Sequence, residues 1–252
     1  MPFWMPTARF SGAQIPHISF PLARPLGIRA VFVTDIHRSS DFTHQHLLLL
    51  ADQIQALRPD LLLLGGDYGE SVADIQDVLR ILGDISAPLG RFGVPGNNDV
   101  WFYSQDMDRL SADAAHRGVR LMINETAETE EIFLAGLQEM RWNQPEYRDY
   151  FVGQEEKCRL LLAHYPHAVP KAISAMTVKP HMAFSGHTHG GQFALGRLTP
   201  YSIGFEKHYG SLPTPAGEVM LDGVRLLVSH GIGTSRIPLR IHAAPQIHLI
   251  EM

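Results

Sequence analysis

The sequence has little cysteine, no cluster of basic charge and no apolar run of membrane-spanning length. Its single cysteine, Cys158, cannot form an internal disulfide, so nothing in the chain calls for an oxidising compartment. We expect Cys158 to be a small buried hydrophobe. The N-terminal segment lacks the basic start and the continuous apolar centre of a signal peptide, and no stretch is long enough to span a bilayer. These absences predict a cytoplasmic protein.

The charge balance restricts the partners of the chain. The formal net charge is −5 at pH 7, without a basic run, which argues against a protein that holds nucleic acid stably by its phosphates. A phosphate-containing small molecule stays open as a substrate. The hydrophobic fraction of 45% and the charged fraction of 19% are typical of a globular domain with a sizeable core. Because no linker interrupts the apolar residues, we expect one domain over residues 1–252.

Residues 1–27 form an extension for which the sequence leaves two alternatives. Phe3, Trp4, Met5 and Phe10 are apolar and could make peripheral contact with a membrane surface. Prolines in the same segment break any amphipathic helix, which favours an edge strand instead.

The first half of the chain alternates strand-like and helix-like segments. Apolar runs predict strands at 28–35, 59–67 and 90–97, and longer periodic segments predict helices at 42–57 and 73–85. This alternation is typical of strand-helix-strand units on a largely parallel sheet. Since ligands bind at the carboxyl ends of strands in such sheets, Asp35, Asp67 and the group Asn97–Asp99 should meet along one edge.

The second half, after a predicted helix near Ser104–Arg117, contains shorter alternating runs. They lie at 119–124, 131–137, 158–164, 181–187 and 217–231. The Asp222-Gly223 pair inside the last run is a hairpin signal, since both residues suit a turn with positive φ. A second sheet packed on the first, with helices outside, would accommodate both halves.

Side chains that can bind metals follow the apolar runs. They are Asp35 and His37 in an Asp-x-His pair, Asp67, Asn97, His164, and His187 and His189 in a His-x-His pair. A chain with 14 histidines places some of them beside strands by chance, and any one alone is more often structural. Side chains two apart on an extended segment point the same way, so each pair could bind one cation. The donor types suit zinc, iron or manganese.

Seven candidate donors are too many for one ion. With Asp67 bridging, Asp35, His37 and His189 would complete one site, and Asn97, His164 and His187 would complete another. Hydrolases with two metal ions hold them about 3.5 to 4 Å apart.

The order of these clusters carries a resemblance. The series DIH, GGD, GNND, AHYP and GHTHGGQ closely resembles the blocks of the calcineurin-like metallophosphoesterase superfamily, which are Asp-x-His, Gly-Asp, Gly-Asn-His-Asp, a lone His and Gly-His-x-His. It covers the chain from about Ile28 to the C-terminus. The GHTHGGQ form and the C-terminal sequence further resemble a bacterial branch with membrane-associated phosphodiesterases and UDP-diacylglucosamine pyrophosphatases.

The resemblance implies an α/β fold with four layers, in which helices flank two facing mixed sheets in an α/β/β/α sandwich. It also implies the ligand assignment given above, with two divalent cations, manganese favoured over zinc or iron. Such cations lower the pKa of a bridging water, so that hydroxide can attack a phosphorus in line. The expected substrate is a small phosphate-containing molecule, linked to a nucleotide or to a lipid.

Asn98 departs from the family pattern, which has at this position a histidine that protonates the leaving oxygen. An amide can donate a hydrogen bond but cannot give up a proton at neutral pH. We therefore expect Asn98 to favour pyrophosphate bonds or activated diesters, whose leaving groups need no acid. Asp99 would then either hold Asn98 or cap a helix that begins near Trp101.

Three alternatives remain open at this point. His208 or His230 could supply the missing proton, which would allow a phosphomonoesterase. The chain could also be a metal-holding scaffold without turnover, although it lacks none of the candidate ligands. A dinuclear hydrolase of amides or lactones would share the donor types but not the order of the blocks.

The residues around the clusters add weaker hypotheses about substrate contacts. Arg38, next to His37, could steady a phosphate oxygen or be a surface charge. The aromatic run Trp101–Tyr103 could stack a base, cover an acyl chain or fill a core.

Overall fold

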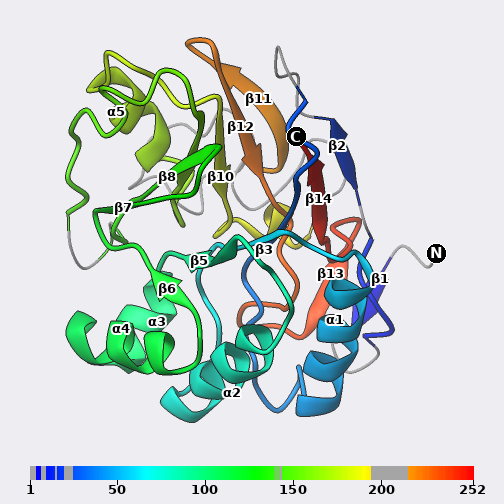
Figure 1. Cartoon of the computed structure of the whole chain (residues 1–252). Helices are drawn as coiled ribbons and strands as arrows, with labels where there is room; N and C mark the ends of the chain where they lie inside the picture. The colour runs from blue at the N-terminus through cyan, green and yellow to red at the C-terminus, as the bar shows by residue number, and fades with distance from the viewer. Residues whose placement is uncertain are drawn as a thin grey trace.

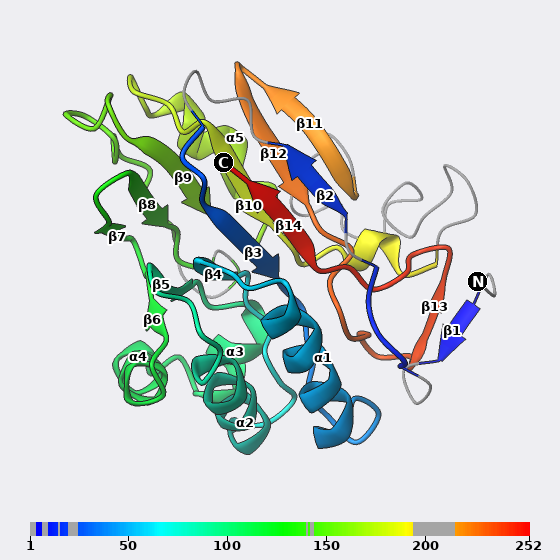
Figure 2. The same cartoon turned by 45° about the vertical axis from the view of Figure 1, so that its right-hand side comes forward.

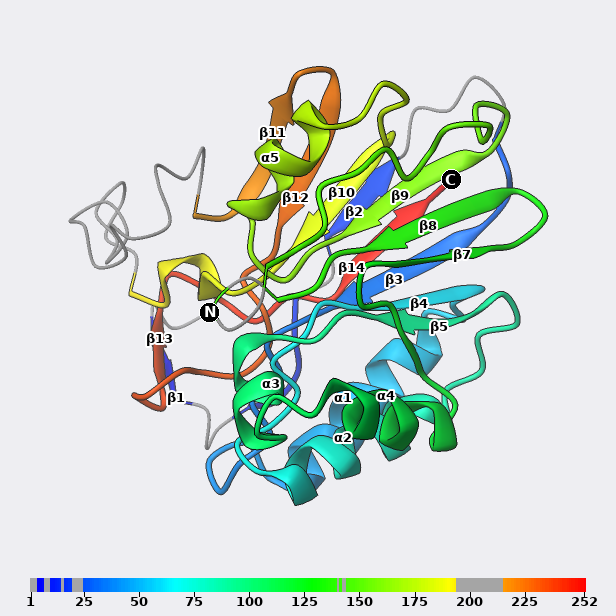
Figure 3. The same cartoon turned by 90° about the vertical axis from the view of Figure 1, so that its left-hand side faces the viewer.

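Two six-stranded β-sheets lie face to face, and helices cover their outer faces (Figure 1). The computed structural model describes residues 4–6, 10–14, 16–19, 25–139, 141, 144–193 and 215–252. Figures 2 and 3 show the sheets in the middle, the N-terminal helices along one side and α5 on the other. This arrangement confirms the predicted four-layer α/β/β/α class.

The first sheet has the strand order β2-β14-β3-β4-β5-β6. Its strands are β2 (His17–Ser19), β14 (His248–Glu251), β3 (Arg29–Val33), β4 (Leu61–Leu64), β5 (Gly90–Gly93) and β6 (Arg120–Leu121). The pairs from β3 to β6 are parallel, whereas β14 runs antiparallel to β3. All four residues of β4 are leucines and all are buried, which is typical of a strand covered on both faces.

The helices of the first half follow these strands in the predicted order. They are α1 (His44–Ala56), α2 (Val72–Gly83), the short α3 (Asn97–Phe102) and α4 (Met107–His116). Thr43 and Ser71 cap α1 and α2 through side-chain oxygens that accept backbone N–H groups. The strands and helices predicted for the first half are thus confirmed, with ends that differ by a few residues, and residue 97, predicted as the end of a strand, begins α3.

The second sheet has the order β11-β12-β10-β9-β8-β7 and is also mixed. Its strands are β11 (Gly217–Leu221), β12 (Val224–Val228), β10 (Met182–Ser185), β9 (Cys158–Leu162), β8 (Ile132–Gly136) and β7 (Glu125–Glu128). The helix α5 (Ala168–Ser174) packs on its outer face (Figure 3). The predicted hairpin joins β11 to β12, with φ of 49° at Asp222 and 83° at Gly223.

One grouping made from the sequence is wrong. The run at 119–124 was placed with the second sheet, but only its residues 120–121 form a strand, and this strand pairs with β5 of the first sheet. Two further strands, β1 (Trp4–Pro6) and β13 (Leu239–Ile241), pair with each other apart from the two large sheets.

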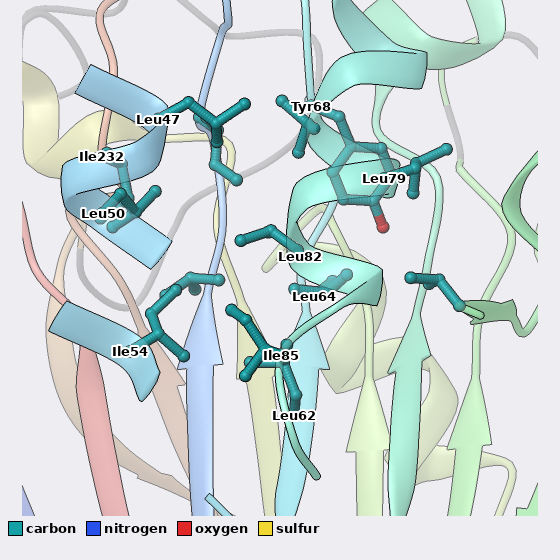
Figure 4. Packing of buried hydrophobic residues seen from close by; sticks show 14 of the residues in the cluster. Leu47, Leu50, Ile54, Leu62, Leu64, Tyr68, Leu79, Leu82, Ile85 and Ile232 are labelled. Atoms are coloured by element: carbon teal, nitrogen blue, oxygen red, sulfur yellow. The ribbon is translucent and has the colours of Figure 1, made fainter. Parts of the chain in front are cut away.

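Three hydrophobic cores fill the spaces between the four layers. The first packs the outer face of the first sheet against α1, α2 and α4, and Figure 4 shows leucine and isoleucine side chains from both layers meeting there. The second lies between the two sheets, and it includes Phe32, Phe184 and Cys158. The third lies between the second sheet and α5. Cys158 is 4% exposed, which confirms its expected role as a buried hydrophobe.

Of the four N-terminal residues considered for membrane contact, Phe10 has a described side chain, and this side chain is buried. Phe10 is only 6% exposed and packs its ring 5.0 Å from that of Phe42, because the segment folds back over α1. Phe3 and the side chains of Trp4 and Met5 lie outside the described part of the structure. Among the helices described, none is both long and apolar enough to cross a bilayer.

Candidate metal centre

Most candidate ligands lie on loops at the carboxyl ends of parallel strands, as the sequence predicted, while Asn97 and His189 are the first residues of short helices. Asp35 and His37 follow β3, Asp67 follows β4, and Asn97 follows β5. In the second sheet, His164 follows β9, and the pair His187 and His189 follows β10. Since the two sheets face each other, these loops converge on one edge of the sandwich.

Six of these side chains form two groups that could each hold a cation. The first group is Asp35, His37 and His189, and the second group is Asp67, His164 and His187. Within each group the candidate ligand atoms all lie within 4.8 Å of one another, and every residue is buried. Asn97 joins the second group, because its Oδ1 lies 3.3 Å from His164 Nε2.

The backbone reason first given for the pairing is wrong. Asp35 and His37 are not extended, since their φ angles are 53° and 47°, and His187 and His189 have φ of 69° and 52°. A left-handed backbone is uncommon for residues other than glycine and concentrates at functional sites. The turn at Thr188 therefore sends His187 and His189 into different groups, whereas Asp35 and His37 share one.

Asp67 lies between the two groups. Its Oδ2 is 3.5 Å from His37 Nε2 and 3.5 Å from His164 Nε2, which is the position of a shared ligand. Its Oδ1 accepts a hydrogen bond from the Asn98 backbone N–H at 2.8 Å. Burial disfavours the charged carboxylate, but the neighbouring histidines, His164 first, hold the pKa of Asp67 below its ordinary value. A Cβ at Gly96 would come within 2.2 Å of Asp67 Oδ1, so this close approach requires glycine.

The second group is surrounded by neutral partners. His164 Nδ1 donates to the Gly65 carbonyl at 2.8 Å, which leaves Nε2 facing Asp67 and Asn97. The Tyr165 hydroxyl donates to Asn97 Oδ1 at 3.1 Å, and the Tyr165 ring stacks on His187 with centroids 3.9 Å apart. Burial alone would lower the pKa of His164, but hydrogen bonding and the negative charge of Asp67 raise it to about 10.

The first group has charged partners. His37 Nδ1 donates to a Glu70 carboxylate oxygen. Burial lowers the pKa of His37, but this hydrogen bond and the negative charge of Asp67 outweigh burial and raise it. His37 Nε2 is buried and has no hydrogen-bond partner among the described atoms. A buried nitrogen left in this state is costly unless something binds it. The atom lies 3.5 Å from the carboxylate oxygen Oδ2 of Asp67, where a divalent cation fits its chemistry.

A buried arginine lies behind His189. Arg240 is 2% exposed, and its Nη2 lies 3.2 Å from His189 Nδ1. The same guanidinium donates to the carbonyls of Gly233 at 2.7 Å, Ala243 at 3.0 Å and His189 at 3.2 Å. Burial lowers the pKa of Arg240 to about 10, and burial together with the charges of His37 and Arg240 keeps the pKa of His189 well below its usual range.

Asp35 is fixed by hydrogen bonds from both sheets. The Thr34 hydroxyl donates to its Oδ2 at 2.8 Å, and the His187 backbone N–H donates to it at 3.0 Å. This contact joins the loop after β3 to the loop after β10. The first group is therefore held by residues from both halves of the sandwich.

Asn98 and Asp99 take positions that the sequence described only in part. Asn98 Nδ2 donates to Glu70 Oε1 at 2.9 Å. Asp99 is fully buried, and its carboxylate accepts backbone N–H groups of Gly96, Asp67 and Tyr68 at 2.8 to 2.9 Å. The helix that Asp99 caps is α3, which begins at Asn97 and not near Trp101. Burial and Asp67 raise the pKa of Asp99 to about 7.

The residues proposed from the sequence as substrate contacts differ in exposure and in partners. Trp101 is 59% exposed, whereas Tyr103 is buried and donates its hydroxyl to Asp113 at 2.7 Å. Arg38 contacts Asp74 at 3.3 Å and Asp77 at 3.4 Å on α2, so its charge is already paired on the helical side.

The two alternative proton donors have different outcomes. His208 lies outside the described residues. His230 is half-buried, its Nδ1 donates to the Ala244 carbonyl at 3.1 Å, and burial lowers its pKa.

The sequence did not identify three residues that contact the candidate ligands. These are Glu70, Tyr165 and Arg240. Tyr165 and Glu70 lie within three positions of a predicted ligand, a proximity that could have drawn attention to them. Arg240 is 51 positions from His189 and gave no signal in the sequence.

Comparison with known proteins agrees with this geometry. The family model of calcineurin-like phosphoesterases matches residues 28–191. The uncharacterized protein YpbG of Bacillus subtilis is 26% identical, over 97% of this chain and 90% of its own length. The uncharacterized metallophosphoesterase YkuE of the same organism is 28% identical, over 90% of this chain and 79% of its own length. The phosphodiesterase YaeI of Escherichia coli is 24% identical, over 89% of this chain and 82% of its own length. The chain belongs to the family of calcineurin-like phosphoesterases, metal-dependent hydrolases of phosphoric esters.

Proposed function

We propose that this protein hydrolyses phosphodiester or pyrophosphate bonds with two divalent cations. One observation carries the proposal: Asp67 Oδ2 lies 3.5 Å from both His37 Nε2 and His164 Nε2, between two buried groups of ligand-type side chains. The first cation would be held by Asp35, His37, Asp67 and His189, and the second by Asp67, Asn97, His164 and His187. Imidazole, carboxylate and amide oxygen form a donor set that suits manganese, zinc or iron, and we favour manganese.

The chemistry divides between the cations and the protein. When bound, the cations supply a water of lowered pKa and positive charge for the transferring phosphoryl oxygens. The side chains of this protein place those cations: Asp67 joins the two positions, and Glu70 fixes the ring of His37. Asp99 contributes through the backbone, because it ties the loop that carries Asp67 to the loop that carries Asn97.

Asn98 determines which leaving groups suit the site. Its amide can donate a hydrogen bond to a developing oxyanion but cannot transfer a proton. Bonds to phosphate or to an acidic alcohol break without such a transfer, which favours pyrophosphates and activated diesters over alkyl phosphomonoesters. Of the two alternative acids, His230 is described: its Nδ1 donates to the Ala244 carbonyl at 3.1 Å, and burial lowers its pKa.

The substrate is proposed to be a small molecule with a nucleotide or lipid attached to the phosphate. Trp101 supports this, since it is 59% exposed on α3, only three positions after Asn98. Its indole face could stack on a base or lie against an acyl chain.

A leaving-group series tests the proposed function. The chain is purified, loaded with Mn²⁺ and assayed on aryl methyl phosphodiesters whose phenols differ in pKa, with His189→Ala as the control. We expect Mn²⁺-dependent turnover whose rate falls steeply as the leaving-group pKa rises. A shallow dependence would show that an acid protonates the leaving group.

A second set of assays separates the alternatives. A pyrophosphate-linked dinucleotide and a pyrophosphate-linked lipid are compared with an alkyl phosphomonoester under the same conditions. Preference for the monoester would point to a phosphomonoesterase, and absence of any metal-dependent turnover would favour a scaffold.

A further inference from the structure

A line of side-chain hydrogen bonds connects the two groups of ligands on their exposed side. It runs from His37 of the first group through Glu70 and Asn98 to Asn97 of the second. His37 Nδ1 donates to Glu70 Oε1, and Asn98 Nδ2 donates to the same oxygen at 2.9 Å. Asn97 Nδ2 then donates to Asn98 Oδ1 at 2.9 Å.

The last bond decides which end of the Asn97 amide faces the second group. An asparagine amide carries an acceptor oxygen at one end and two N–H donors at the other, and only the oxygen can bind a cation. Because Asn97 Nδ2 is directed to Asn98, its Oδ1 faces His164 at 3.3 Å and the Tyr165 hydroxyl at 3.1 Å. An amide turned by half a rotation would present N–H groups to that position.

Asn98 has the same two-ended chemistry, and Glu70 removes the ambiguity. An ionised carboxylate accepts hydrogen bonds only, so the Asn98 end that meets Glu70 must be the nitrogen. The oxygen of Asn98 is then left for Asn97. Glu70 in turn is held by the ring of His37, which is buried. Each bond thus fixes the direction of the next.

We infer that Asn98 is a positioning residue, which together with Glu70 turns the Asn97 amide oxygen toward the second cation. The inference rests on the proposed function, since it takes Asn97 as a ligand. Where the family pattern has a histidine, this chain has Asn98, and the replacement would then affect metal binding as well as the choice of leaving group. Asn98 and Glu70 act through Asn97 and need not touch the substrate.

The test measures Mn²⁺ binding and not turnover. Mn²⁺ is titrated into the metal-free full chain, and the two binding steps are followed by calorimetry and by electron paramagnetic resonance. Loss of a residue behind a metal ligand lowers metal affinity about 10- to 100-fold, so Asn98→Ala should weaken the second step about tenfold and leave the first within about twofold. Glu70→Ala should weaken both steps, because His37 loses its partner as well.

A double-variant cycle separates orientation from a general structural effect. Asn97→Asp has an oxygen at both ends of its carboxylate, so its orientation no longer matters. In that background, adding Asn98→Ala should not weaken the second binding step, because the Asn98 oxygen no longer has a donor from which to accept. Rescue of this kind would not occur if Asn98→Ala simply damaged the loop.

The outcomes distinguish this inference from the proposed function. The inference is overturned if Asn98→Ala binds both cations as the unmodified chain does, or if it weakens the second step equally in both backgrounds. If the unmodified chain binds two cations and shows the expected cycle but hydrolyses no phosphate ester, the proposed activity fails and the positioning role stands.

Discussion

The two groups of candidate ligands have similar donors but different surroundings. Behind the first group lie two charged residues, Glu70 at His37 and Arg240 at His189. Behind the second group lie neutral partners, the Gly65 carbonyl at His164 and the Tyr165 hydroxyl at Asn97. Charged side chains thus hold the ligands of the first position, and neutral hydrogen bonds hold those of the second.

Because of this difference, we expect the two proposed cations to be bound unequally. A carboxylate behind a ligand histidine raises its basicity, whereas a carbonyl mainly fixes its orientation. The first group also has its own carboxylate, Asp35, while the second shares Asp67 and has no other. We expect the affinities of the two positions to respond to different substitutions, and four predictions test this.

The largest effect should come from removing the residue that the two groups share. Asp67→Asn weakens both positions, because an amide has one acceptor oxygen in place of two and carries no charge. We expect the rate at saturating substrate to fall about a thousandfold, with loss of both bound cations. Activity and metal content are measured together, with the exposed Asp52→Asn on α1 as the matched control. Full occupancy of either position in Asp67→Asn would show that Asp67 does not join them.

The next effect concerns the charge behind the first group. Arg240→Met removes the donors to three buried carbonyls and the positive charge that lies 3.2 Å from His189 Nδ1. We expect the metal-free chain to lose about 3 kcal/mol of unfolding free energy, since buried acceptors lose their partners. Urea unfolding measures this, and Arg80→Met, a half-exposed arginine on α2, should change it by less than about 1 kcal/mol. Equal effects of the two variants would contradict a special role for the buried charge.

The two positions should also differ in the order in which they release metal. Because the first group has an additional carboxylate, its cation should be held about tenfold more tightly than that of the second. Dialysis against increasing chelator should therefore remove the second cation first. The half-loaded protein should then show the manganese resonance spectrum of His164→Ala, which retains the first position. A spectrum like that of His189→Ala would reverse the assignment.

The smallest effect tests a neutral partner. Tyr165→Phe keeps the ring that stacks on His187 but removes the hydroxyl that donates to Asn97. One hydrogen bond of about 1 kcal/mol corresponds to a second cation bound about fivefold more weakly, with the first unchanged. Tyr103→Phe, which removes a hydroxyl bound to Asp113, is the control and should alter neither position. An equal loss of affinity for both cations would show that the Tyr165 hydroxyl does not act on the second position alone.

Much of this site could be predicted because parallel strands direct their ends to one edge. The apolar runs before Asp35, Asp67 and His164 identified the strands, and the order of the polar clusters identified the family. The local conformation could not be predicted in the same way. Asp35 and His37 share a group although their backbone is left-handed, which the spacing of two residues does not indicate.

Contacts between distant segments escaped the sequence for a different reason. Arg240 reaches His189 from β13, a three-residue strand too short to give a periodic signal. The strand β14 joins the first sheet next to β3 from the other end of the chain. Such pairings depend on the completed fold, and no pattern in a single segment specifies them.

The left-handed backbone of the candidate ligands has a consequence for the stability of the fold. Asp35, His37, Asp67, His187 and His189 adopt these angles, and each such conformation costs about 1 kcal/mol or more when the chain folds. The packing and hydrogen bonds of the surrounding structure must offset this cost, so the loops that carry the candidate ligands lower the stability of the protein while they shape the site.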